Sequence, residues 1–274
     1  MSKRNSQTAK TAARERLREE RERQARRAKA KRQAIVAGSV VAVLAAAGGI
    51  GYAVVQANKP AYWAGLKDAK VVAPANTTGA KGTTVVIGKS TAKKTLKVYE
   101  DPRCPICASF EQTVGATVKK DVDDGKYKIQ YIGGTFIDNK DNGQGSKNAL
   151  SALGAALNVS PEAFLEYKSA LYSTTWHPDE TTDKFKDDAY LIKVADTVPA
   201  LKNNTQFQNA VKKGTYDAWA MAMSATFDNN KDGVSGTPSF VMNGKLLTTN
   251  GQPTGNPPMS VADFNRLVDA ALKA

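Results

Sequence analysis

The feature that most constrains this chain of 274 residues is a run without a single charge, residues 34–55. As an α-helix rising about 1.5 Å per residue, a run of this length spans the roughly 30 Å hydrocarbon core of a bilayer. The preceding residues, 1–33, contain 13 Lys and Arg residues and 4 Glu residues. We therefore predict a basic cytoplasmic tail over 1–33 and a transmembrane signal-anchor helix over 34–56.

Two other interpretations of the apolar run stay open. A cleaved signal peptide also joins a basic segment to an apolar one, although its apolar part is usually about 7–15 residues long. The run is rich in Ala and Gly, so its hydrophobicity is modest and this alternative stands. A buried core helix is disfavoured, because a helix that is apolar all round needs a body to wrap it.

The charge distribution predicts orientation and excludes one class of partner. By the positive-inside rule, the tail stays in the cytoplasm and the body from about residue 57 lies outside the plasma membrane, in a single-pass topology. The tail accounts for +9 of the net charge of +13, and the rest of the chain for only +4. A body this close to neutrality does not indicate a nucleic-acid partner.

Pattern and turn signals predict an α/β body. Residues 57–82 are interpreted as a linker. Expected strands cover 83–87, 95–99 and 127–132, with a helix between the last two that opens near Cys104 and runs to Val122. Expected helices cover 148–157, 161–172, 183–198 and 205–225, followed by a hairpin around Asn243-Gly244 and a helix over 261–274. This order fits an α/β sandwich, 83–145 and 226–274, with a helical insertion, 146–225.

The candidate chemistry lies in Cys104-Pro105-Ile106-Cys107, directly after a predicted strand and at the start of a predicted helix. Unpaired N–H groups at a helix N-terminus favour a thiolate over a thiol, and Arg103 adds to this if its side chain turns inward. A purely structural disulfide would close a loop too short to restrict the unfolded chain much. Haem attachment requires a His where Ala108 stands. A zinc site would have to recruit the only His in the chain, His177.

The segments VYEDPRCPIC, residues 98–107, and GVSGTPSFVMNGK, residues 233–245, resemble the DsbA-like thioredoxin-fold oxidoreductases of bacterial envelopes. The membrane-anchored actinobacterial versions are especially similar. The resemblance implies a thioredoxin fold with an inserted helical domain, preceded here by one transmembrane helix. It also implies a cis bond from Thr237 to Pro238, lying against Cys104 and Cys107, with the Thr237 backbone binding the substrate strand.

Two departures from the family bear on redox strength. The residues between the cysteines are Pro105 and Ile106, not the Pro-His of the best-known oxidases, and Val98 replaces a buried acid that some members place six residues before the first cysteine. Glu100 and Asp101 are closer, and we expect them to be exposed carboxylates that water screens. Arg103, Pro105 and Ile106 are the candidate residues for tuning the thiolate.

The sequence therefore predicts a membrane-anchored thiol–disulfide oxidoreductase that oxidises exported cysteine-containing proteins through Cys104 and Cys107. No metal or organic cofactor is expected, because the dithiol itself carries the electrons. The resemblance implies re-oxidation by a quinone-linked membrane partner. A reductase or isomerase is the alternative within the class, and a non-catalytic thioredoxin-fold binding module is the alternative outside it.

Other features carry less weight. Residues 228–233, DNNKDG, resemble the first half of a calcium loop, but Ser239 stands where such a loop needs a bidentate Glu, so a polar turn is the better interpretation. We expect His177 to be a surface or capping residue. Trp219, Met221 and Met223 lie at helical spacing and are expected in the core or lining a groove.

Overall fold

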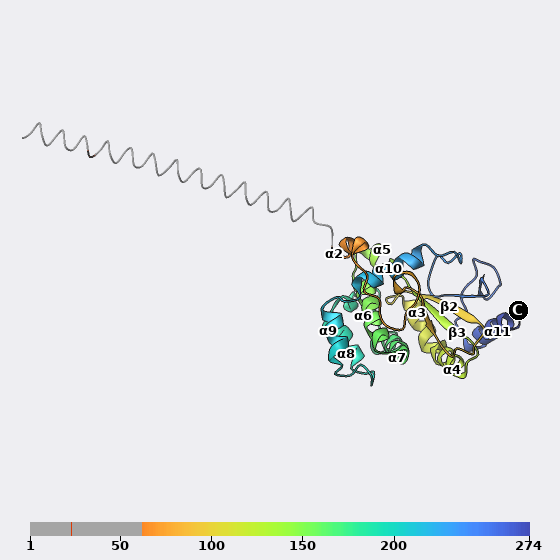
Figure 1. Ribbon diagram of the computed structural model, residues 1–274. Coiled ribbons are helices and arrows are strands. Elements are labelled where there is room, and N and C mark those ends of the chain that lie inside the picture. The colour runs from red at the N-terminus through yellow and green to blue at the C-terminus, as the bar shows by residue number, and fades with distance from the viewer. Residues whose placement is uncertain (1–22, 24–61) are drawn as a thin grey trace, which may run out of the picture. The chain divides into compact units, whose positions relative to one another are not determined.

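The computed structural model describes Arg23 and residues 62–274 (Figure 1). The predicted transmembrane helix, and the tail apart from Arg23, lie outside the described residues. Within the part of the chain that is described, no helix has both the length and the apolar character needed to cross a membrane. The anchor thus stays a prediction from the sequence.

A five-stranded mixed sheet forms the centre of the body. In the order β1-β3-β2-β4-β5, its strands are β1 (Val85–Ile87), β3 (Lys128–Gly133), β2 (Thr95–Glu100), β4 (Ser239–Met242) and β5 (Lys245–Leu246). Strands β2 and β3 are parallel, and the other three pairings are antiparallel. The chain that follows β2 contains both cysteines, and the β2–helix–β3 crossover places it at the carboxyl ends of the two parallel strands, β2 and β3.

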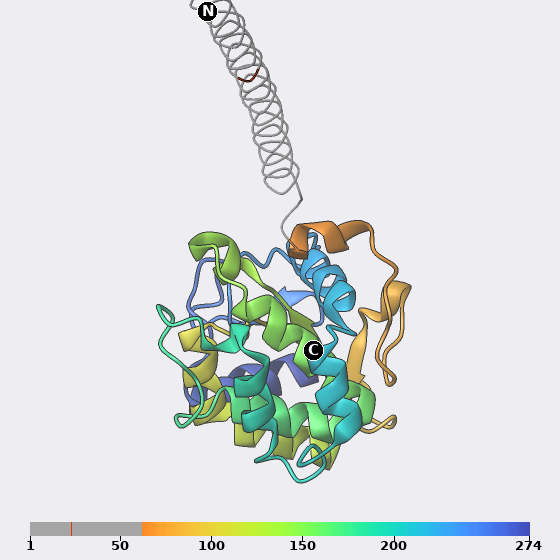
Figure 2. The same ribbon diagram turned by 90° about the vertical axis from the view of Figure 1, so that its left-hand side faces the viewer.

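Helices surround this sheet, and four of them, α6 to α9, lie together on one side of the body (Figures 1 and 2). The crossover contains α3 (Pro105–Phe110), a π-helical turn (Glu111–Gly115) and α4 (Ala116–Asp124). Between β3 and β4 the helical insertion is longer than the expected 146–225. It contains α5 (Phe136–Asp141), α6 (Gly145–Val159), α7 (Pro161–Leu171), a 3₁₀ turn (Lys184–Lys186), α8 (Asp188–Ala195), α9 (Thr205–Lys212) and α10 (Asp217–Asp228). The last helix is α11 (Val261–Lys273).

Local sequence explains several of these boundaries. Ser160 caps α7, its side chain accepting from the N–H of Ala163 at 3.0 Å, and Pro161 occupies the first turn, where a missing N–H costs little. Both residues of the Asn243-Gly244 turn have positive φ, as a tight hairpin between β4 and β5 requires. The element order is the one that the resemblance implies.

The helices of the structure differ from the predictions in three places. The helix expected over 183–198 is a 3₁₀ turn, Lys184–Lys186, followed by the shorter α8, Asp188–Ala195. The single helix expected over 205–225 is divided into α9 and α10, because Gly214 adopts a left-handed φ of 59° that a continuous helix cannot contain. Helix α5 was not expected. It is a short helix that follows β3 directly and ends at Asn142, which also has a left-handed φ of 57°.

The segment expected to be a linker is packed onto the body from Tyr62 onward. It begins with α2 (Tyr62–Gly65) and two 3₁₀ turns, Leu66–Asp68 and Ala80–Gly82. The indole of Trp219 donates to the carbonyl of Gly82 at 2.8 Å, and the side chain of Asn76 donates to the carbonyl of Leu157 at 2.9 Å. Residues 62–82 therefore belong to the folded unit.

One apolar core joins the sheet to the insertion. Buried side chains from β2 and β3 are in the same cluster as buried side chains from α6, α7, α9 and α10. Tyr131 of β3, for example, packs edge-on against Phe164 of α7 with ring centroids 5.1 Å apart. The insertion is therefore part of the structure that holds the sheet.

Candidate active site

The two cysteines meet at the N-terminus of α3. Cys104 is the N-cap residue, and its sulfur accepts a hydrogen bond from the backbone N–H of Cys107 at 3.4 Å. Both are free thiols in this structure. Cys104 is 5% exposed and Cys107 is fully buried, so one sulfur is placed for contact with a partner and the other lies behind it.

This placement separates the acidities of the two thiols. The pKa of Cys104 is lowered from 9.0 to about 6, and the largest cause is a hydrogen bond from the Cys107 thiol. The Thr237 side chain and the N–H groups of Ile106 and Cys107 lower this pKa further, whereas burial opposes them. Burial raises the pKa of Cys107 well above its ordinary value, and the hydrogen bond to Cys104 and the charges of Cys104 and Glu100 raise it further. The pair thus contains one thiolate and one thiol at neutral pH.

Thr237 and Pro238 lie against the dithiol, and the bond between them is cis. The sulfur of Cys104 lies 3.5 Å from the carbonyl of Thr237, to which it donates a hydrogen bond when it is protonated. A groove of about 720 Å³ runs past this point, lined by Ile106, the Thr237-Pro238 pair, residues 246–249 and residues 253–257 among others. Ile106 is 53% exposed, so it gives the mouth of the dithiol an apolar surface.

Arg103 is not turned toward the sulfurs, contrary to the expected thiolate tuning. Its guanidinium is 2% exposed and contacts carboxylates of the helical insertion: Asp138 at 2.9 Å, Asp141 at 2.6 Å and Asp183 at 3.5 Å. A buried guanidinium requires such counter-charges, and here they draw it away from the dithiol. Arg103 therefore fixes the loop before Cys104 to the insertion.

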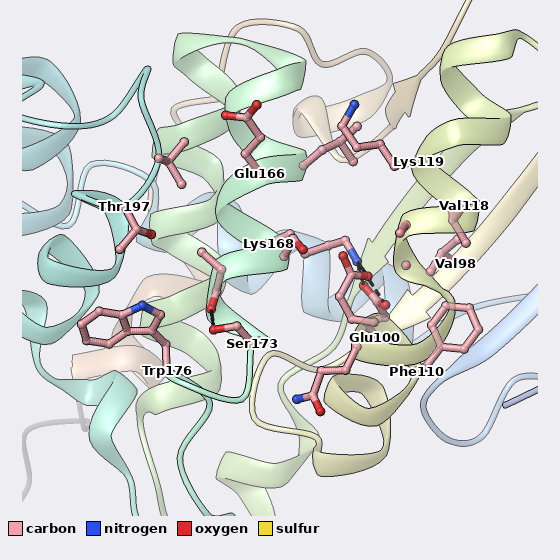
Figure 3. A pocket seen from close by; sticks show the side chains of 18 of the residues that line it. Val98, Glu100, Phe110, Val118, Lys119, Glu166, Lys168, Ser173, Trp176 and Thr197 are labelled. Carbon is pink, nitrogen blue, oxygen red and sulfur yellow. Dashed lines mark hydrogen bonds and ion pairs between the residues drawn. The ribbon is translucent and has the colours of Figure 1, made fainter. Parts of the chain in front are cut away.

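The expectation that Glu100 and Asp101 are exposed is wrong, since both side chains are fully buried. Glu100 is the last residue of β2, and Lys168 of α7 approaches it, with Nζ 3.4 Å from Oε1 (Figure 3). Lys168 also binds Glu111 at 2.6 Å. These three residues line a cavity of about 770 Å³ between the crossover helices and α7. Burial raises the pKa of Glu100 to about 7, although Lys168 opposes this.

Asp101 is also held inside, by hydrogen bonds to its carboxylate. The hydroxyl of Ser146 donates to it at 2.6 Å, and the N–H groups of Arg103 and Ile137 at 2.9 and 3.2 Å. Burial raises its pKa to about 7, against these bonds. Sequence reasoning missed the burial of both acids, because it depends on Lys168 and Ser146, which lie 68 and 45 residues away in the sequence.

The remaining residues singled out in the sequence lie outside the dithiol. His177 is half-buried, and its Nδ1 lies 3.3 Å from the carbonyl of Leu171. Trp219 and Met223 are core residues. Asp232, in the loop that resembles half a calcium site, is bound by Lys97 and Tyr99 instead. Among the described residues, no group of three or more His, Cys, Asp or Glu side chains is arranged to hold a metal ion.

The fold and the site together define a DsbA-like domain of the thiol–disulfide oxidoreductase class. The defining features are a thioredoxin-type sheet with a helical insertion, a dithiol at a helix N-terminus and a Thr-Pro pair that faces the dithiol. The family model described as thioredoxin matches residues 80–270. The chain belongs to the thioredoxin family.

Solved structures of mycobacterial oxidoreductases have the same fold. The reduced form of the disulfide bond oxidoreductase DsbG from Mycobacterium tuberculosis is 26% identical, with a TM-score of 0.54 over 70% of this chain and 93% of that one. Reduced DsbA from the same organism is also 26% identical, with a TM-score of 0.54 over 70% of this chain and 98% of that one.

Curated relatives include a protein kinase and a protein of disulfide bond formation. The serine/threonine-protein kinase PknE of M. tuberculosis is 27% identical over 176 residues, which are 62% of this chain but only 30% of the kinase. Disulfide bond formation protein D of Bacillus subtilis is 25% identical over 164 residues, or 59% of this chain and 68% of that protein. The chain thus spans less than a third of the length of the kinase it matches.

The acidity of the two thiols predicts which one reacts. In the reduced protein, alkylation of Cys104 by iodoacetamide should be half-maximal near its pKa of about 6, because only the thiolate reacts. Cys107 should stay unmodified through neutral pH. Mass spectrometry of the labelled peptides against pH measures both. A midpoint near 9, or faster labelling of Cys107, would contradict the assigned roles, and Cys104→Ser serves as the unreactive control.

Because Arg103 binds carboxylates and not the sulfurs, we expect its replacement to destabilise the protein strongly without changing the pKa of Cys104. Arg103→Met removes the nearer of the two cations that face the buried Asp138 and leaves only Lys147, at 3.4 Å, which should lower the free energy of unfolding by about 3–5 kcal/mol. Arg266→Met, at a surface pair whose Arg side chain is 57% exposed, should change it by less than about 1 kcal/mol. Urea unfolding gives both values, and equal losses would refute this assignment.

Proposed function

We propose that this protein is a membrane-anchored, extracytoplasmic thiol–disulfide oxidoreductase that oxidises cysteines of exported proteins. The observation that carries the proposal is the position of Cys104 at the N-terminus of α3, where the Cys107 thiol and two backbone N–H groups lower its pKa to about 6. A thiolate held in this way is both a good leaving group and a stabilised product of reduction.

The reaction transfers two electrons from a client dithiol to the Cys104–Cys107 disulfide. A client thiolate attacks the sulfur of Cys104, the bond between the two cysteines breaks, and Cys107 leaves with the electron pair. A second client thiolate then attacks the client sulfur of the mixed disulfide, and Cys104 leaves as a thiolate. The client gains a disulfide and the enzyme holds a reduced pair.

Cys107 requires a proton when it leaves, because its pKa in the folded protein is raised well above its ordinary value. Glu100 is our candidate source of that proton: like Cys107 it is fully buried, and it ends the strand that leads to the dithiol. Its charge contributes to raising the pKa of Cys107, and its own pKa of about 7 lets it give and take a proton near neutrality. We assign Glu100 the role of a proton reservoir behind the pair, where some family members place an acid two positions earlier, at the residue occupied here by Val98.

The acidity of Cys104 supports the oxidising direction. Lowering its pKa from 9.0 to about 6 stabilises the reduced pair at pH 7 by roughly 1–2 kcal/mol, or some tens of millivolts in a two-electron couple. The stabilisation grows as the pH rises from about 6 and is lost below it. Reductase or isomerase activity is the alternative if other interactions favour the disulfide more strongly.

The sequence supports the proposed topology and partners. The charge-free run at 34–55 behind a basic tail supports an anchor with the body outside the plasma membrane. Each turnover leaves the pair reduced, so an oxidase needs an electron acceptor. The family resemblance supports a quinone-linked membrane protein in that role and exported cysteine-containing proteins as clients.

A non-catalytic binding module is the second candidate, and the similarity to part of the kinase PknE favours it, since that relative is named as a kinase and not as an oxidoreductase. Such a module has no need of a thiol with a lowered pKa. Rapid alkylation near pH 6 would therefore count for catalysis.

Trapping of clients tests the catalytic proposal. Cys107→Ser should accumulate mixed disulfides with exported proteins, since the mixed disulfide at Cys104 then has no internal thiol to release it. The adducts should appear on non-reducing gels and vanish with reductant. The matched variant Cys104→Ser should accumulate none. Equal trapping by both variants, or none by either, would contradict the assigned roles.

Protease accessibility tests the topology. Protease added to intact spheroplasts should digest the body and spare the tail, residues 1–33, because the proposed anchor separates them. A tag at each end, detected by blotting, reports the two fates. A body protected from external protease would refute the topology. A mature form that begins beyond residue 55 would convert the anchor into a signal peptide.

A further inference from the structure

The loop that brings Thr237 to the dithiol is anchored at its two ends. This Thr237 loop, residues 229–238, joins α10 to β4. At its C-terminal end, Ser239 pairs with Tyr99 in the sheet, and its hydroxyl donates to the carbonyl of Gly236 at 2.8 Å. The middle of the loop is open, because a Cβ added at Gly233 or Gly236 would meet nothing within 4 Å. The position of Thr237 therefore also depends on the anchor at the other end.

That anchor is Asp232. Its carboxylate binds Nζ of Lys97 at 2.7 Å and also accepts a hydrogen bond from the hydroxyl of Tyr99. Tyr99 is 3% exposed and the Asp232 side chain 13%, so the bond between them is largely shielded from water, whereas the Lys97 side chain is 37% exposed. The side chain of Asn230 shapes the turn, its Oδ1 accepting from the N–H groups of Asp232 and Val234 at 3.1 and 3.0 Å.

Both partners of Asp232 lie on the strand that leads to the dithiol. Lys97 and Tyr99 are two residues apart on β2, so they project from the same face of the strand. The chain continues from β2 through Glu100 to Cys104. One strand thus fixes both sides of the 3.5 Å contact between the sulfur of Cys104 and the carbonyl of Thr237.

We propose that Asp232 is a positioning residue of the active site, which fixes the Thr237 loop on β2 and thereby sets the gap between Thr237 and Cys104. This inference rests on the proposed function, since the gap is where a client strand would bind. Displacements of about 1 Å in reacting geometry can cost 10²-fold in rate. The turn at residues 228–233, which resembles half a calcium site, thus positions the Thr237 loop.

The test compares Asp232→Asn and Tyr99→Phe with Asp228→Asn, a control that removes the same charge four residues away. Asp228 forms none of the ion pairs among the described residues. Two quantities are measured below the melting temperature of each variant: the pH midpoint of Cys104 alkylation, and the rate of disulfide exchange between the oxidised protein and a cysteine-containing peptide. The alkylation midpoint does not depend on clients, and a purely structural role would not change it.

We expect Asp232→Asn and Tyr99→Phe each to slow exchange about tenfold or more, with the control matching the wild type. Both should also move the alkylation midpoint to higher pH, because the Thr237 side chain helps to lower the pKa of Cys104 and would be displaced with the loop. The double variant should lose little more than the larger single loss, because both changes break one anchor. Exchange and midpoint equal to the control in both variants would overturn the proposal. If Asp232→Asn does not fold, Tyr99→Phe decides alone. A wild type that exchanges with no peptide would instead refute the proposed function.

Discussion

The hydrogen bonds that converge on the sulfur of Cys104 determine what this protein can do, and much of the surrounding structure keeps that sulfur at the start of α3. The N–H groups of Ile106 and Cys107 and the Cys107 thiol favour its thiolate over its thiol. These donors exist only because β2 ends four residues earlier and α3 begins at once. The chemistry is therefore a consequence of the strand–helix junction, with Thr237 facing it from a separate part of the chain.

The junction is built from buried charges, and these require partners. Glu100, Asp101 and Arg103 are all buried within four residues of Cys104. Leaving any of them unpaired would cost several kcal/mol. The helical insertion supplies the partners: Lys168 from α7 for Glu100, Ser146 from α6 for Asp101, and Asp138 from α5 for Arg103. The insertion thus contributes to the active site as well as to the core.

Sequence alone could predict the parts that depend on local rules. The spacing of the two cysteines after a strand, the Ser160-Pro161 helix start and the Asn243-Gly244 turn each have a local physical signature, and the structure contains all three. Arg103 could not be placed in this way. The direction of its side chain depends on three carboxylates that are 35 to 80 residues away in the sequence.

The same limit applies to Glu100 and Asp101. Charged residues at the end of a strand are usually exposed, and only the insertion packed over this end of β2 makes them buried. The left-handed Gly214 that divides α9 from α10 is likewise selected by packing, since a Gly within a helical pattern is often tolerated. The family resemblance added what local rules could not, namely that Thr237 and Pro238 meet the dithiol across more than 130 residues of sequence.

The reduction potential of the Cys104–Cys107 pair tests the central claim most directly, namely that a stabilised Cys104 thiolate makes this protein an oxidant. Equilibration of the purified body with glutathione buffers of defined ratio gives the value. A lowered thiol pKa favours the reduced pair, so the account predicts a potential clearly above the roughly −270 mV of thioredoxin. A value at or below that of thioredoxin would contradict the oxidase assignment and favour a reductase with the same fold and the same two cysteines.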